Sequence, residues 1–370
     1  MTKNINISLL SLVFFFIFII RNGAVYSFGD SIWVDFFIRS DAFTLENDIL
    51  GLSKTLTNNY WVQTVKFFSK YLNILFIFYI YYFLHIFLYF FLIFKIFQKL
   101  SVSKNIYKYI LIGLAVSNIK FISGALVYLT PGGFNYKDTA NILLLFAIYF
   151  LVVSKKYYIS IFIYIVSAIF HLPSSIAFLP ISICIIFKKK FKILSFIFFF
   201  ILINCLIFFY YYSSKNEIAY LLSNNLIRNL LNLRIPYLFF ENWEILYKIN
   251  FILIYFNLFL LALISTKNYR YLLIVMLFFH LIYLLFVSLS NDLKYLSVFK
   301  YGFDLKILVI IFIFEFVNQI NEDLKINFNN FLIWAGVISL FLFSNQSLMF
   351  IIFGYILFSN KKKLLINKLF

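Results

Sequence analysis

The sequence predicts an all-α polytopic membrane protein, with its 370 residues forming a single integral membrane domain. Hydrophobic residues make up 64% of the chain and charged residues only 12%, and the mean hydropathy is +0.96. These values exclude a water-soluble domain of this length. The apolar runs are also longer than the roughly 10 residues of a membrane-barrel strand, and such runs satisfy their own backbone in lipid only as helices.

A window of roughly 20 residues divides the chain into about twelve transmembrane helices. The first apolar run is predicted to be an uncleaved span and not a signal peptide, because only Lys3 precedes it and no clean cleavage site follows. Two pairs of these spans, one on either side of His171 and one on either side of Asn345, are short. Each pair is short enough to form a re-entrant hairpin instead of two full crossings, which gives a range of about 10 to 12 helices. In chain order the spans are residues 5–20, 71–97, 107–129, 138–154, 157–171, 174–187, 193–212, 249–266, 271–288, 305–320, 331–343 and 346–359.

The distribution of basic residues orients these spans. Lysine and arginine concentrate in alternate short loops and at both termini, which assigns those parts to the inside. The only acids on that side are Glu322 and Asp323, so most of the net charge of +18 lies inside. Because the lysines are scattered over short loops beside apolar runs, the charge indicates topology and predicts no nucleic-acid partner.

The first large external loop, residues 21–70, is polar and nearly neutral in charge. After Gly29, apolar residues recur at helical spacing, with Asp35 and Arg39 on the opposite face, which predicts an interfacial helix. Asp30 is either the N-cap of this helix or a carboxylate held at the membrane surface beside Arg21. Asp35 and Arg39 are interpreted as a surface ion pair, which the sequence favours over a catalytic role.

The second large external loop, residues 213–248, also predicts a helix that lies on the bilayer. Leucines form one stripe of this helix, and asparagines with Arg228 form another. Arg228 and Arg234 would lie at headgroup depth, where a guanidinium group suits phosphate oxygens. The alternative for both arginines is snorkelling to lipid phosphate, which needs no substrate.

Histidines and cysteines limit the chemistry further. His85 and His280 lie in the middle of apolar spans and are interpreted as polar core residues with satisfied hydrogen bonds, whereas His171 lies at the outer end of a short span before Pro173. At that position His171 can reach water and titrate near neutrality, although an interfacial or capping role explains it as well. Cysteine, histidine and carboxylate residues form no cluster with metal-ligand spacing, so we expect neither a metal nor another cofactor.

Several short motifs occur in order in the first half of the chain, to about residue 179. They are Tyr136-Lys137-Asp138-Thr139-Ala140, then Lys155-Lys156, Phe170-His171 and Ser174-Ser175, with Arg21 and Gly29-Asp30 in the first external loop. These motifs resemble the EpsG-like branch of the Wzy-type polysaccharide polymerases, and the first external loop is similar to the start of that family. The resemblance implies an enzyme of the bacterial inner membrane that joins undecaprenyl-diphosphate-linked oligosaccharide units on its external face. A chain-length regulator would be a further partner, beside the lipid bilayer. The family usually has arginine where this chain has Lys137, which weakens bidentate phosphate binding at that position.

The reaction that the resemblance implies assigns roles to the external residues. A sugar hydroxyl of one unit attacks the anomeric carbon of another, so the site must neutralise a leaving diphosphate and take up a proton. Asp30 and His171 are the candidate catalytic bases. The candidate diphosphate-binding residues are Arg21, Lys137, Arg234 and Lys300, with Arg39 and Arg228 as further candidates.

Two other functional classes share many of these features. A membrane glycosyltransferase that uses a polyprenyl-phosphate sugar would have a similar external acidic loop. A flippase for lipid-linked oligosaccharides, which is a transporter, would place its charges inside the helix bundle and have short external loops. In the predicted spans only Lys120 and Glu315 lie deep, which favours the enzymes.

Overall fold

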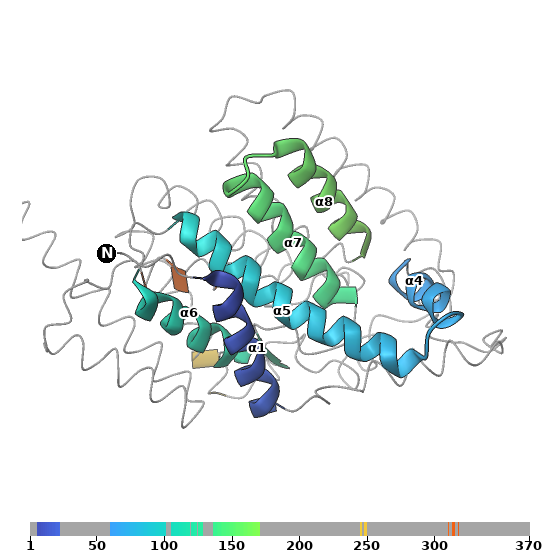
Figure 1. Cartoon of the computed structure of the whole chain (residues 1–370), viewed down its shortest axis with the longest axis horizontal. Helices are drawn as coiled ribbons and strands as arrows, with labels where there is room; N and C mark the ends of the chain where they lie inside the picture. Colours follow the sequence, from blue (N-terminus) through green and yellow to red (C-terminus); the bar gives the residue numbers. More distant parts are fainter. Residues whose placement is uncertain are drawn as a thin grey trace, which may run out of the picture. The chain divides into compact units, whose positions relative to one another are not determined.

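The computed structural model describes residues 6–22, 60–100, 105–118, 120–123, 125–128 and 136–170, with 245, 248–249, 310, 313–314 and 317 (Figure 1). This part of the chain is mainly helical, as predicted. Its elements are α1 (Ile7–Asn22), α4 (Tyr60–Ser69), α5 (Ile74–Leu100), α6 (Ile106–Asn118), β1 (Lys120–Ser123), β2 (Ala125–Tyr128), α7 (Tyr136–Val152) and α8 (Tyr157–Phe170). The predicted spans from residue 174 onward are outside the described elements, so the expected total of about twelve remains a prediction.

Among the described helices, α5 is the one that is long and apolar enough to cross a bilayer, over Ile74–Lys99. It has 27 residues, which corresponds to about 40 Å of helix. Shorter apolar helices cover Ile7–Ile20, Ile106–Ser117, Asp138–Leu151 and Tyr158–Phe170. Each of these five helices begins and ends within a few residues of a predicted span, with one exception. The exception is α6, which ends at Asn118, whereas the predicted span continues to residue 129.

Asparagine side chains mark the starts of α1 and α5. The Leu9 N–H donates to Asn6 Oδ1 at 3.2 Å, and the Leu75 N–H donates to Asn73 Oδ1 at 2.9 Å. Both asparagines therefore act as N-caps and satisfy a backbone donor that the helix leaves unpaired. The predicted span starts at residue 71, but α5 starts at Ile74 because Asn73 caps the helix there.

Helices α7 and α8 form an antiparallel hairpin and lie side by side in Figure 1. The connection is tight because Lys155 adopts a left-handed conformation with φ of 55°. The Ser160 hydroxyl donates to the Ala147 carbonyl at 2.7 Å, and the Ser167 hydroxyl donates to the Ala140 carbonyl at 3.0 Å. These small residues recur every seven positions on both helices, which allows the two backbones to approach closely.

One predicted span is wrong in its second half. The apolar run over residues 107–129 was expected to form a continuous helix, but α6 ends at Asn118 and an antiparallel hairpin of β1 and β2 follows. Ser117, Asn118, Lys120 and Ser123 interrupt the apolar pattern there, and Gly124 separates the strands in the sequence. Lys120 is therefore the first residue of a strand and does not lie within a transmembrane helix. Strands were not expected anywhere in this chain.

The chain divides into two compact units. One contains α1 from Ser11, α4, α5 as far as Ile96, α7 and α8. Within it, Phe14 of α1 packs against Phe90 and Phe94 of α5, with ring centroids 5.8 and 5.6 Å apart. The other unit contains the end of α5 with α6, β1 and β2, and there Phe97 packs against Tyr109 at 5.1 Å.

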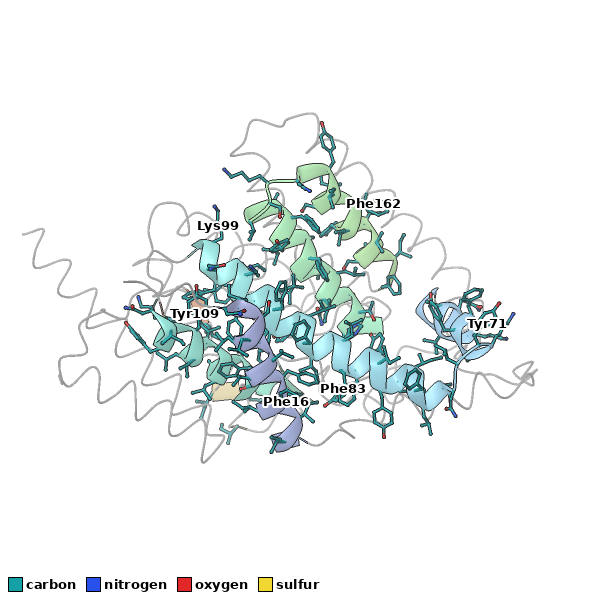
Figure 2. All side chains as sticks on the ribbon, in the orientation of Figure 1. Phe16, Tyr71, Phe83, Lys99, Tyr109 and Phe162 are labelled. Carbon is teal, nitrogen blue, oxygen red and sulfur yellow. The ribbon has the colours of Figure 1, made fainter. Side chains whose placement is uncertain are left out.

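Large apolar side chains also cover the outside of the first unit. Figure 2 shows Phe16 on α1, Tyr71 at the turn between α4 and α5, and Phe162 on α8, and all three are more than half exposed. The first half of α5 exposes a further set of apolar residues, namely Leu75, Phe76, Tyr79, Ile80 and Leu84. Exposed apolar surface on this scale is typical of a lipid-facing or partner-facing helix.

Candidate functional site

The described helices bring five polar side chains together where α7 starts beside α5. We call this set the α5–α7 polar cluster: Tyr81, His85 and Tyr89 on α5, and Asp138 and Thr139 on α7. The three α5 residues are four positions apart, so they form one stripe along a helix that is otherwise almost entirely apolar. All five belong to the same compact unit.

A hydrogen bond joins the two helices within the cluster. It links the Tyr81 and Thr139 hydroxyl groups, and either hydroxyl can be its donor. Tyr81 is the eighth residue of α5 and Thr139 is the fourth of α7, so α7 starts about 10 Å along α5 from its first residue. The N-terminal turn of α7 therefore lies beside the interior of the apolar helix and not at its end.

Asp138 is the only carboxylate among the residues whose side chains the structure describes, and it is 5% exposed. It is the third residue of α7, where the helix dipole and unpaired N–H groups stabilise a negative charge. Asp138 also interacts electrostatically with Tyr89 of α5, which is buried. Burying an ionisable group within an apolar helix bundle is expensive, which makes Asp138 a candidate functional residue.

His85 is held in a defined orientation by Tyr81. Its Nδ1 atom donates to the Tyr81 carbonyl oxygen at 2.8 Å, and the two rings are stacked with their centroids 3.6 Å apart. The interpretation of His85 as a polar core residue with a satisfied hydrogen bond is thus confirmed for Nδ1. Among the described side chains, none bonds to Nε2.

The α8 helix supports the first turn of α7 from the other side. Ser167 is buried, and its hydroxyl group bonds to the carbonyl of Ala140, the residue that follows Thr139. This bond fixes the backbone beside Asp138 and Thr139. Ser167 therefore links α8 to the part of α7 that carries the cluster.

The residues that the sequence singled out are only partly described. Arg21 lies in the last turn of α1, and Lys137 is the second residue of α7, directly before Asp138. Six others lie outside the described residues, namely Asp30, Arg39, His171, Arg228, Arg234 and Lys300. Of the motif over residues 136–140, the structure thus brings Asp138 and Thr139 to α5.

The sequence interpretation missed the contribution of α5. The chain has 54 Phe and 28 Tyr, so a single tyrosine such as Tyr81 or Tyr89 does not indicate a functional site. The informative signal is their spacing around His85, since the order Tyr-x3-His-x3-Tyr places three polar groups on one face of a single helix.

Comparisons with known proteins add no family assignment to this geometry. Protein-family models, curated proteins and solved structures were all searched, and none of them matches this chain.

Proposed function

We propose that this chain is a polytopic inner-membrane enzyme that joins undecaprenyl-diphosphate-linked saccharide units, as a polysaccharide polymerase does. The observation that carries the proposal is the burial of Asp138 beside the tyrosine and histidine stripe of α5. Asp138 belongs to the five-residue motif, Tyr136 to Ala140, on which the resemblance to Wzy-type polymerases mainly rests. The motif residues thus contribute to a polar cluster between apolar helices.

The physical properties of the cluster suit glycosyl transfer without a metal. Attack by a sugar hydroxyl needs a proton acceptor and a group that stabilises developing positive charge, and an imidazole and a carboxylate supply these. The leaving diphosphate needs positive partial charge, for which the N-terminal turn of α7 with Lys137 is suitably placed in the chain. The apolar faces of α1, α5 and α8 would contact lipid.

A direct assay tests the proposal. The purified protein, reconstituted in liposomes, should convert lipid-linked repeat units into a ladder of longer saccharides without added metal. Transfer of single sugars from a polyprenyl-phosphate donor, with no ladder, would instead support the rival glycosyltransferase.

A second candidate function is transport of a lipid-linked saccharide across the membrane. The observation that favours it is the position of the cluster, since Asp138 and His85 place ionisable groups beside the interior of an apolar helix, where transporters bind substrates. Lys120, which was expected to be one of two deep charges, starts a strand instead. Movement of a fluorescent lipid-linked saccharide between leaflets, with no change in its size, would identify a transporter.

A further inference from the structure

We propose that Nε2 of His85 is the atom that accepts the proton of the attacking sugar hydroxyl. This inference rests on the proposed function and adds a catalytic residue that the sequence interpretation assigned only to the protein core. It replaces Asp30 and His171, the two bases expected from the sequence, with a residue whose hydrogen bonding is described.

The tautomer of His85 follows from its hydrogen bond. A carbonyl oxygen can only accept, so the 2.8 Å bond to Tyr81 requires the proton of the neutral ring to be on Nδ1. The other nitrogen, Nε2, then carries a lone pair and is the basic atom. This arrangement, with one nitrogen held by an acceptor and the other directed to the reaction, is the usual one for a histidine base.

The orientation of the ring is fixed by a short series of contacts. The imidazole stacks on the Tyr81 ring, and the Tyr81 hydroxyl is hydrogen-bonded to Thr139 at the start of α7. Ser167 in turn holds the next residue of α7. A base that is held in this way loses little further freedom when the reaction occurs.

Asp138 supplies the compensating charge. When Nε2 takes up a proton, the ring becomes positively charged in a region of low dielectric, where an isolated charge is unfavourable. The buried Asp138 carboxylate interacts electrostatically with Tyr89, which is one helical turn along α5 from His85, and in this proposal it also stabilises the imidazolium. Tyr81 and Tyr89 are the other titratable groups of the cluster.

The transfer forms one bond and breaks one bond at the anomeric carbon. The acceptor hydroxyl oxygen forms a bond to the anomeric carbon of the donor while its proton moves to Nε2. The bond from that carbon to the diphosphate oxygen breaks, and its electron pair leaves with the polyprenyl diphosphate. The imidazolium then returns its proton to the diphosphate or to water.

The test compares His85→Gln with the matched variant His280→Gln, because His280 is the other histidine in the middle of a predicted span. Each purified variant is assayed for polymer synthesis from lipid-linked repeat units. We expect His85→Gln to lower turnover by roughly 10²- to 10⁴-fold with a KM within about threefold of the wild type, and His280→Gln to stay near the wild-type rate. His171→Gln and Asp30→Asn are assayed beside them to compare the alternative bases.

Chemical rescue separates a lost base from a damaged fold. Imidazole added to His85→Ala should restore part of the polymer synthesis, and it should have no effect on His171→Ala. Turnover of His85→Gln within threefold of the wild type, or a larger loss in His171→Gln or Asp30→Asn, would overturn the assignment while leaving the proposed function intact. Absence of rescue would overturn it as well. If the wild type itself forms no polymer, the proposed function fails first.

Discussion

Two sides of α5 pack by different physical means. Against α1, aromatic rings pack on one another, with Phe14 of α1 against Phe90 and Phe94 of α5 and Phe18 against Phe90. Against α7 the contact includes a hydroxyl–hydroxyl bond and a buried carboxylate. In a bilayer, lipid chains can replace ring contacts but cannot replace a hydrogen bond or balance a charge. The polar side is therefore the one suited to chemistry.

The strongest test of this comparison removes the charge from the polar side. Asp138→Asn preserves the size of the side chain but cannot stabilise a protonated His85. We expect polymer synthesis to fall by about 10²-fold or more at unchanged protein abundance. The control is Asn141→Ala, which changes a neighbouring polar residue of α7 outside the cluster and should have little effect. Normal synthesis by Asp138→Asn would remove the cluster from the mechanism.

The aromatic side should respond in stability rather than in turnover. Phe14 is 2% exposed, so Phe14→Ala leaves a cavity against α5 and should lower the free energy of unfolding by about 1 to 3 kcal/mol. Phe16→Ala, two positions away on the same helix, alters a side chain that is 57% exposed and should change stability little. Unfolding of both purified variants in mixed detergent micelles measures the difference. Equal effects would mean that α1 does not pack as described.

The two serines of α8 distinguish a bond near the cluster from a bond distant from it. Ser160→Ala and Ser167→Ala each remove one bond to an α7 carbonyl, so each should lower the free energy of unfolding by about 0.6 kcal/mol. Only Ser167→Ala should also slow polymer synthesis, because its partner Ala140 follows Thr139. If both variants lost turnover equally, Ser167 would have no specific positioning role.

The smallest expected effect concerns the turn between α7 and α8. Lys155 has a positive φ, which is unfavourable for a residue with a Cβ atom and is readily adopted by glycine. Lys155→Gly should therefore raise the free energy of unfolding by about 0.5 to 1 kcal/mol. Lys156→Gly relieves no such strain, and it should be neutral or slightly destabilising. The same micelle titration compares the two variants. A gain in both would indicate a general effect of removing a lysine.

Much of the local structure of the described part was predictable from the sequence. The apolar runs over residues 71–97, 138–154 and 157–171 correspond to α5, α7 and α8, since continuous apolar length is a strong signal. The exact start of α5 depends on the Asn73 cap. The hairpin after α6 was not predicted, because the apolar content of residues 107–129 hides the change from helix to strand.

The polar cluster was less predictable for a different reason. Tyr81 and Thr139 are 58 positions apart, and their contact depends on how two helices pack, which no local pattern encodes. His85 looked like an ordinary core histidine because its neighbours in the sequence are apolar. Asp138 was noticed in its motif, but its burial could be known only from the structure.

The β1–β2 hairpin changes the predicted path of the chain through the bilayer. With 13 residues, α6 is about 20 Å long, shorter than a hydrocarbon core of about 30 Å, and the strands after it fold back on themselves. The 17 residues of α7 reach only about 25 Å. If neither helix completes a crossing, the two predicted passes between Lys104 and Lys155 are lost together, and both lysines stay on the same side of the bilayer.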